Sequence, residues 1–427
     1  MNSGAPTEDF PLPDDWQSST LGNLADQERG ITYGIVQPGQ HAPNGVPIIR
    51  VQNIVGGTLD TSDVMRVAPE IAAKYRRTCL RGGELLLSLV GSVGSSVIAP
   101  KEVAGWNTAR AVAVVPLQEG VDARYIRFCL RSAPLQHWME VWCNTTVQAT
   151  LNLSDVARLP IPIPPKRERE AIVEVLAALD DKIELNRRMN RTLEELAAAL
   201  FRSWFVDFDP VVANAAGRKP AHLRAHLATL FPVHFQDSAL GAIPQDWNVV
   251  NLTDAIKLEY GEALKETIRR PGSIPVFGSN GQVGWHDQKL VDGPGIVVGR
   301  KGNPGTVTWV DDDFFPIDTT FYVVRRSQEY GWQFLFHALR ALELQGLAAD
   351  SAVPGLNRNA ALQNSVLIPK SEVQVAFERI TTPWWHQVRH NELESWTLAA
   401  LRDTLLPKLL SGELRVKSAE KLVEATV

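Results

Sequence analysis

The sequence predicts an α+β protein in which a mixed α/β segment followed by a long helix occurs twice. Two amphipathic runs are each long enough for a helix of roughly forty residues. Each run follows a β-rich segment divided by Gly and Pro. The two segments open on similar strings, LPDDW at 12–16 and IPQDW at 243–247. We therefore expect a pseudo-two-fold tandem repeat whose long helices form an antiparallel intramolecular coiled coil.

The composition is that of a soluble globular protein with several domains. The chain has 427 residues, of which 44% are hydrophobic and 21% are charged. No apolar run is long enough to span a membrane, and the acidic, polar N-terminus does not resemble a signal peptide, so we expect a cytoplasmic protein. The net charge of −5 argues against a generally basic nucleic-acid-binding surface, but a local basic face is compatible with it.

The first mixed segment is expected over residues 1–164. Short apolar runs bounded by Gly and Pro predict strands within residues 46–54, 83–100 and 109–117. A helix-like stretch follows at 123–139. A proline cluster before residue 166 then ends the segment, and prolines are tolerated in the first turn of the helix that follows.

A long central helix is predicted over residues 165–210. Its apolar residues recur at alternating steps of four and three, in the order Ile172, Leu176, Leu179, Ile183, Leu193, Ala197 and Leu200. The same register falls on Asn186 and Asn190, which has two interpretations. Either the amides lock the register against a partner helix, or the register is off by one, Met189 is the core residue and the amides are exposed.

The second half is expected to repeat this order. Residues 211–234 form a linker with one short helix, and residues 235–370 form the second mixed segment. Strands are expected within 274–279, 295–300, 305–310 and 319–324, and a helix at 332–347. Asn280-Gly281 between apolar runs predicts a tight turn.

A second long helix is predicted over residues 371–416, with a tail at 417–427. Its heptad positions are Phe377, Ile380, Trp384, Val388, Asn391, Leu398, Leu401 and Leu405. Pro383 predicts a kink or a restart, because proline removes a donor and clashes with the preceding turn.

Landmarks in the two halves follow one order. Trp16 and Trp247 are 231 residues apart, Asn152 and Asn357 are 205 apart, and Glu194 and Glu394 are 200 apart. Chance could supply one such pair, but the shared order indicates a tandem repeat.

Several long strings resemble the specificity subunits of type I restriction–modification systems. They are AALFRSWFVDFDPV (198–211), FQDSALGAIPQDW (235–247), PVFGSNGQVGWHDQKLVDGPGIVVGRKGNPGTV (275–307), DTTFYVV (318–324) and LRDTLLPKLLSGELRV (401–416). VPIIRVQNI and GELLLSLVGSVGSSVIAP resemble strands of the family's target-recognition domains. The resemblance covers nearly the whole chain, in the family's order of domains.

This resemblance implies a non-catalytic DNA-recognition subunit. Each target-recognition domain would read one half of a bipartite target in double-stranded DNA, and the paired helices would set the unread gap. Two modification subunits, which carry S-adenosylmethionine and methylate adenine, would dock on the helices. Restriction subunits, which use ATP and Mg²⁺, could join them. No cofactor is implied in this chain.

Motifs for catalysis are missing from the sequence. There is no phosphate-cradling GxxxxGK[ST] loop, and the Pro164-Pro165 pair lacks the neighbours of an amino-methyltransferase motif. We expect no metal site, because the His222/His226 and His386/His390 pairs lack the other ligands of a known zinc motif.

Candidate DNA contacts are polar and basic residues on loops of the two mixed segments. For the first domain they are Arg50, Gln52, Asn53, Ser92, Ser95, Asn107 and Arg110. For the second they are Ser279, Asn280, Arg300, Lys301 and Asn303. Each residue could instead be a solvated turn residue or a polar group at a strand end.

Two other classes of function are weighed against DNA recognition. A structural adaptor would use the coiled coil for protein assembly without reading DNA, and the negative net charge slightly favours it. A self-contained methyltransferase or nuclease is disfavoured by the missing motifs.

Overall fold

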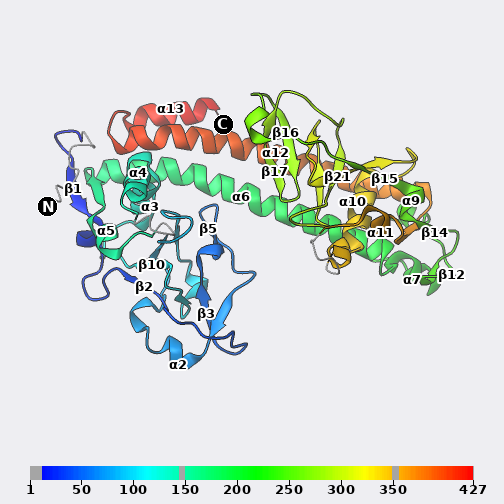
Figure 1. Ribbon diagram of the computed structural model, residues 1–427, viewed down its shortest axis with the longest axis horizontal. Helices are drawn as coiled ribbons and strands as arrows, with labels where there is room; N and C mark the ends of the chain where they lie inside the picture. The colour runs from blue at the N-terminus through cyan, green and yellow to red at the C-terminus, as the bar shows by residue number, and fades with distance from the viewer. Residues whose placement is uncertain (1–11, 144–149, 349–354, 427) are drawn as a thin grey trace. The chain divides into compact units, whose positions relative to one another are not determined.

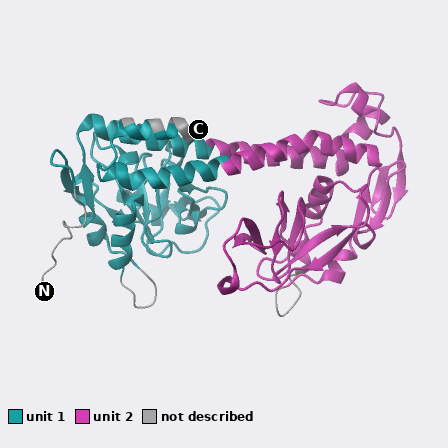
Figure 2. Cartoon of the chain, turned by 90° about the horizontal axis from the view of Figure 1, so that it is seen from above, with its two compact units in different colours: residues 1–184, 394–427 teal, residues 185–393 magenta. Residues whose placement is uncertain are grey.

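The computed structural model describes residues 12–143, 150–348 and 355–426. Its contacts divide the chain into two compact units (Figure 2). Unit 1 comprises residues 1–184 and 394–427, and unit 2 comprises residues 185–393. The division passes through both long helices, so each helix contributes one part to each unit. The domain boundaries expected from the sequence, which set the helices apart, stay predictions.

Unit 1 is a mixed α/β assembly of short strands (Figure 1). Its elements before the long helix are β1 (Gln17–Thr20), α1 (Leu21–Leu24), β2 (Thr32–Tyr33), β3 (Val46–Ile49), β4 (Ile54–Val55), β5 (Thr58–Leu59), β6 (Met65–Val67), α2 (Pro69–Ala72), β7 (Leu85–Ser88), β8 (Ser96–Ile98), β9 (Asn107–Thr108), β10 (Val112–Val115), α3 (Ala123–Arg131), α4 (Ala133–Val141), α5 (Leu153–Arg158) and β11 (Pro160–Ile163). One helix was expected at 123–139, but two are present. Pro134 lies at the start of α4, where its missing N–H costs nothing.

Unit 2 begins inside the central helix and continues with the segment between that helix and the second set of strands. Its elements are α7 (Asp209–Ala215), α8 (Ala225–Ala228), β12 (Phe235–Ser238), β13 (Gly241–Pro244), β14 (Asn248–Asn251), α9 (Leu252–Ala255), β15 (Ile256–Tyr260), β16 (Ile274–Gly278), β17 (Gly281–His286), β18 (Gly295–Gly299), β19 (Val307–Val310), β20 (Phe315–Pro316), β21 (Thr320–Arg325), α10 (Trp332–Ala341), α11 (Arg358–Leu362) and β22 (Ser365–Ile368). The expected linker holds α8 and most of α7 rather than one helix. It is also packed, since Val211 and Phe231 are buried in the unit's core.

The sheets of the two units have the same topology. The four-stranded order β2-β10-β7-β8 in unit 1 corresponds to β15-β21-β18-β19 in unit 2. The three-stranded order β6-β3-β9 corresponds to β17-β16-β20, and the pair β1-β11 corresponds to β14-β22. Each three-stranded sheet contains one parallel pair, β3 with β9 and β16 with β20. The predicted α+β tandem repeat is therefore confirmed at the level of strand order.

The two long helices, α6 (Lys166–Phe205) and α12 (Ser371–Leu410), each contain 40 residues and start 205 residues apart. The 200-residue spacing of Glu194 and Glu394 is therefore not the spacing of the repeat. A further helix, α13 (Val416–Thr426), occupies the expected tail. Within unit 1, Asp180 pairs with Arg402 at 2.7 Å and Lys182 pairs with Glu394 at 3.1 Å. A higher residue number on α6 meets a lower one on α12, so the helices are antiparallel.

The asparagine positions confirm the predicted register lock, and both amides lie in unit 2. Asn186 is fully buried, and its Nδ2 donates to the main-chain oxygen of Asn391 at 3.3 Å. Asn391 Nδ2 donates to Asn190 Oδ1 at 2.7 Å. Met189 is 36% exposed, so the alternative register was wrong. With a repeat of 205 residues, Asn186 and Asn391 occupy equivalent positions.

The distal helix differs from its prediction around Pro383. It continues unbroken through this residue, so the expected restart was wrong. Pro383 is exposed, which lets water satisfy the carbonyl that its ring leaves without a donor. Of the two neighbouring tryptophans, Trp385 and not Trp384 is buried, because it packs against Trp309 and Phe336.

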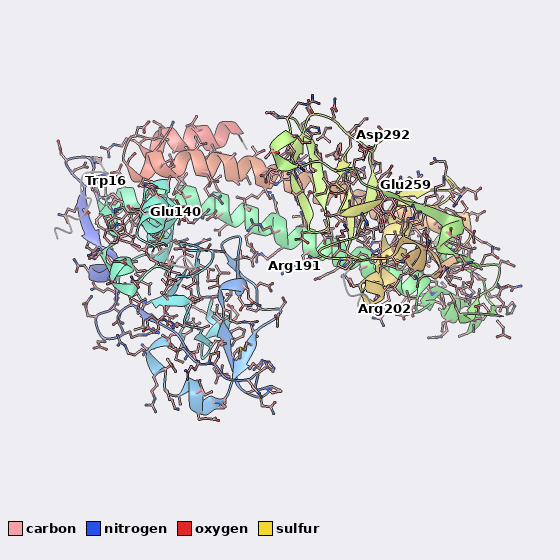
Figure 3. All side chains as sticks on the ribbon, in the orientation of Figure 1. Trp16, Glu140, Arg191, Arg202, Glu259 and Asp292 are labelled. Carbon is pink, nitrogen blue, oxygen red and sulfur yellow. The ribbon has the colours of Figure 1, made fainter. Side chains whose placement is uncertain are left out.

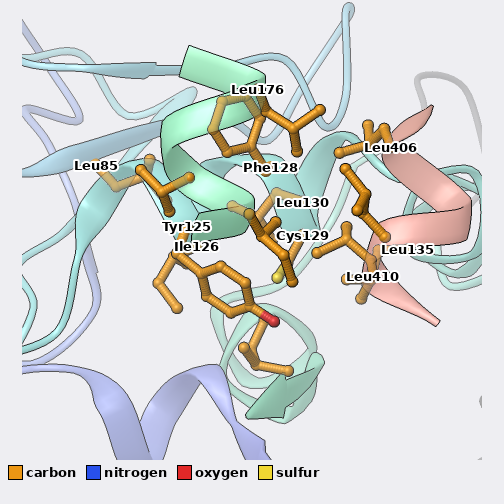
Figure 4. Packing of buried hydrophobic residues seen from close by; sticks show 14 of the residues in the cluster. Leu85, Tyr125, Ile126, Phe128, Cys129, Leu130, Leu135, Leu176, Leu406 and Leu410 are labelled. Carbon is orange, nitrogen blue, oxygen red and sulfur yellow. The ribbon is translucent and has the colours of Figure 1, made fainter. Parts of the chain in front are cut away.

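Each unit has its own hydrophobic core. In unit 1, Leu176 of α6 and Leu406 of α12 pack with α3 residues such as Phe128 and Cys129 (Figure 4). In unit 2 the core is aromatic, and Phe205 has its ring centroid 5.3 Å from that of Phe377. Among the described residues, no helix is long and apolar enough to cross a membrane.

Candidate nucleic-acid interface

One edge of the four-stranded sheet of unit 2 gathers most of the predicted contacts. Strands β15 and β18 both run antiparallel to β21, with Tyr260 opposite Phe321 and Gly299 opposite Thr320. The ends of β15 and β18 and the start of β21 therefore meet at the same edge. We call the loops that leave this edge, together with the β16–β17 turn that contacts them, the loop edge of unit 2.

The loop edge of unit 2 brings five predicted residues together. Asn303, in the loop after β18, donates through Nδ2 to Asn280 Oδ1 at 2.6 Å. The Asn303 backbone N–H lies 3.5 Å from Ser279 Oγ. Arg300 and Lys301 begin the same loop. The β16–β17 turn was expected at Asn280-Gly281, but it consists of Ser279 and Asn280, because Gly281 already pairs with Gly278 as the first residue of β17. A polar surface with two adjacent cations results.

The corresponding edge of unit 1 carries the first-domain candidates. Ser92 and Ser95 lie in the β7–β8 loop, where the Ser95 N–H donates to the Ser92 carbonyl. Arg110 precedes β10, is exposed, and donates through its backbone to Ile35, two residues after β2. Ala109 likewise donates to Ile49, which places Arg50 beside this edge. Loops far apart in sequence thus converge at equivalent places in the two units.

Two first-domain candidates are buried and already hydrogen-bonded. Asn53 donates to the main-chain oxygens of Asp60 and Asp63 and accepts from the Arg50 N–H. Asn107 donates to the Tyr75 carbonyl at 3.0 Å and accepts from the Thr78 hydroxyl. Asn53 holds the turn that it belongs to, and Asn107 of β9 holds the turn at residues 75–78. Neither amide has its side chain at the surface.

The other two candidates near β3 differ from each other. Arg50 is half-buried and its Nη2 lies 3.4 Å from the Asp63 carboxylate. That carboxylate would have to be displaced or shared before the guanidinium could meet a phosphate. Gln52 is exposed.

A tyrosine–glycine pair at the end of the first strand of each four-stranded sheet was missed from the sequence. Tyr33 and Tyr260 are 44% and 47% exposed. The glycine that follows each tyrosine packs against backbone, since a Cβ on Gly34 would lie 1.9 Å from the Thr108 carbonyl oxygen and one on Gly261 2.3 Å from the Ile317 carbonyl oxygen. The signal that could have found them is the same dipeptide at equivalent places in the repeat.

The carboxylates of Glu259 and Glu262 act on Tyr322 rather than on Tyr260. Burial raises the pKa of Tyr322, and the carboxylates of Glu259 and Glu262 raise it further. Tyr322 lies opposite Glu259 across the strand pair. Because side chains alternate along a strand, Glu259 and Tyr260 point to opposite faces of the sheet. Figure 3 labels Glu259 on β15.

The described residues contain no group of three or more metal-ligating side chains. The run Asp311-Asp312-Asp313 illustrates why, because its carboxylates have separate partners. Asp311 accepts from Trp309, Asp312 pairs with Arg389, and Asp313 pairs with Lys289.

Comparisons with known proteins agree with this architecture. Residues 13–195 match the family model described as the type I restriction modification DNA specificity domain. The specificity subunit of the EcoBI type I restriction enzyme of Escherichia coli is 30% identical over 200 residues, and that of the HindI enzyme of Haemophilus influenzae is 25% identical over 332 residues. Residues 13–195 therefore carry a type I DNA specificity domain, and the chain is similar to type I specificity subunits.

The extent of these matches differs. The alignment with the E. coli specificity subunit covers 45% of this chain and 42% of that protein, so this chain spans under half of that relative's length. The alignment with the H. influenzae subunit covers 62% of this chain and 71% of that protein. A crystal structure of the S subunit of the type I system of M. genitalium, 18% identical, covers 95% of this chain and 97% of that chain with a TM-score of 0.54. This likeness shows that the chain shares that fold.

Proposed function

We propose that this chain is a specificity subunit that reads a bipartite target in double-stranded DNA and catalyses nothing itself. One observation carries the proposal: equivalent sheet edges in the two units gather exposed polar and basic residues from loops far apart in sequence. Arg300 and Lys301 in unit 2, and Arg110 in unit 1, supply positive charge despite the net charge of −5. Each loop edge reads one half of the target, and the paired helices set the gap between the halves.

The exposed candidates divide into different tasks. Ser92, Asn280 and Asn303 offer donors and acceptors suited to base edges, and arginine and lysine suit phosphates or guanine. Buried Asn53 and Asn107 hold the loops in shape. This division follows from their hydrogen bonds within the chain.

Modification subunits dock on the long helices. Leu185, Met189 and Leu196 of α6 are exposed apolar side chains at spacings of four and seven, which puts them on one face of the helix. Such a stripe on an otherwise polar helix favours a protein partner. The modification subunits bring S-adenosylmethionine, and restriction subunits bring ATP and Mg²⁺.

The test purifies the subunit with its modification subunits and sequences the methylated adenines of the host genome. We expect one split motif. Exchanging residues 1–160 for those of another family member should change one half of that motif and leave the other half intact. A genome without a split motif, or an exchange that changes both halves, contradicts the proposal.

A structural adaptor that does not touch DNA is the second candidate, favoured only by the negative net charge. DNA binding by the assembled complex that weakens steeply with salt would exclude it, because phosphate contacts release counterions.

A further inference from the structure

Two guanidinium groups share one exposed aromatic ring at the loop edge of unit 2. The Cζ atom of Arg300 lies 4.9 Å from the ring centroid of Tyr260, and that of Arg358 lies 5.0 Å from it. Both distances are within the range of cation–π attraction. Arg358 reaches this place because the Leu356 N–H donates to the Arg300 carbonyl at 2.8 Å, which fixes the start of α11 beside the β18–β19 loop.

Cationic side chains gather around this ring. Lys301 adjoins Arg300 and is exposed. Arg300 Nη1 donates to the Asp318 main-chain oxygen at 3.1 Å. In the part of the chain that the structure describes, neither arginine nor Lys301 forms an ion pair with a carboxylate. The nearby Glu259 faces the opposite side of the sheet.

Like charges held this close repel unless an anion lies between or beside them. The ring of Tyr260 is itself fixed, because its centroid lies 5.0 Å from that of buried Phe321. A planar guanidinium held against a fixed ring loses little freedom when it binds an anion, and its fork of donors matches phosphate geometry.

We infer that Tyr260, Arg300 and Arg358 form a clamp for backbone phosphate of the DNA half-site that unit 2 reads. Arg300 and Arg358 bind the phosphate oxygens, and Tyr260 is a positioning residue that holds both guanidiniums through its ring. The inference rests on the proposed function and adds Tyr260 and Arg358 to its contact residues. It assigns the clamp to affinity and register rather than to base choice.

The test uses the complex of this chain with its modification subunits and a DNA duplex that carries the motif found by methylome sequencing. The dissociation constant for the duplex is measured at several salt concentrations. Arg358→Gln should make the slope of log affinity against log salt less steep by about 0.9, the loss of one phosphate contact, without changing the motif. Tyr260→Leu keeps an apolar side chain on Phe321 but removes the π face, so it should also flatten the slope. Tyr260→Phe should keep the wild-type slope.

Arg218→Gln is the matched control, because Arg218 is exposed in the same unit and has no place at the loop edge. Co-elution of each variant with the modification subunits verifies folding. Wild-type slopes for both Arg358→Gln and Tyr260→Leu would overturn the clamp, and so would a relaxed motif in Arg358→Gln, which would indicate base reading. If the wild-type complex itself has no motif, the proposed function fails, and that outcome is distinct from a failure of the clamp alone.

Discussion

Asp180 joins three elements of unit 1 through a single carboxylate. It lies 2.6 Å from Arg131 Nη1, 2.7 Å from Arg402 Nη1 and 3.7 Å from Arg127 Nη1. Burial raises the pKa of this carboxyl, but the arginines outweigh burial and the pKa is lowered overall. The carboxylate therefore stabilises the fold above its unfolded pKa of about 4, and the contribution is lost as the pH falls below that value.

Replacing Asp180 with Asn should lower the free energy of unfolding by about 3 kcal/mol, because three partly buried cations lose their shared anion. Denaturant unfolding at pH 7 measures the change. Asp181→Asn is the control, since Asp181 is exposed beside it in the same helix. Equal stability of the two variants would refute the role of the cluster.

His337 of α10 is buried among aromatic rings, with its ring centroid 5.5 Å from that of Phe201. Burial, together with the nearby charge of Arg340, lowers the pKa of His337 to about 3. The folded state therefore stays neutral at this site while the unfolded state takes up a proton below about pH 6.5. Stability is lost as the pH falls from 6.5 toward 3.

His337→Phe should remove this loss. The gain in unfolding free energy of the variant over wild type should be larger at pH 5 than at pH 7 by about 2 kcal/mol. Denaturant titrations at the two pH values give the difference, and His386→Phe, at an exposed histidine, should show no such trend. A pH-independent difference would mean that His337 does not titrate as its burial requires.

At the scale of elements, hydrophobic periodicity predicted the long helices well and the mixed segments less well. The apolar seam of α6 repeats in steps of four and three, so Ile172 and Ile183 could be assigned to the core from sequence. Trp385 could not, because its burial depends on the aromatic partners Trp309 and Phe336 from distant strands. Asn53 and Asn107 were predicted as DNA contacts because they are polar. Their hydrogen bonds to other parts of the chain form only on folding, so the sequence does not show that they are buried.

The proposed spacer role of the helices makes an element-scale prediction. Asn190 meets Val388 across the antiparallel pair, so Ala197 of α6 lies level with about Thr381 of α12. Inserting seven residues at both places lengthens each helix by roughly 10 Å. A seven-residue insertion also leaves the apolar residues on nearly the same face of each helix. The unread gap should lengthen by about three base pairs, at 3.4 Å each, with both half-sites unchanged. Methylome sequencing gives the gap.

The control inserts the seven residues in α6 alone, which breaks the pairing of the helices and should abolish assembly. A complex with the double insertion that methylates the original gap would refute the spacer role.

At the scale of the whole molecule, the two repeats share strand order but differ in how one helix of each mixed segment meets the long helices. This helix is α3, which follows β10, in unit 1 and α10, which follows β21, in unit 2. Arg127 of α3 and Phe336 of α10 occupy the same position in their helices, and Asp180 and Trp385 occupy the same position in the repeat of long helices. In unit 1 the contact is an ion pair between Arg127 and Asp180. In unit 2 it is aromatic, and the ring centroids of Phe336 and Trp385 are 5.4 Å apart.

This difference predicts unequal responses to salt. Raising the salt concentration from 0.1 M to 1 M shortens the screening length to about 3 Å and weakens the ionic contact. Amides of α3 should exchange about threefold faster, and those of α10 should not accelerate. Hydrogen exchange followed by mass spectrometry compares the two helices in one sample. Equal changes in both would show that the ionic contact does not govern the local stability of unit 1.

The hydrogen bond between Asn186 and Asn391 has a consequence for the origin of the chain. These residues stand at the same place in the two repeats, yet they contact each other. Contact between equivalent residues is the defining property of an isologous interface, in which one surface patch pairs with its own copy. A protein with a single repeat would carry the same patch and could pair with a second copy of itself. The tandem chain then corresponds to the fusion of a homodimer, after which each half could diverge to read its own sequence.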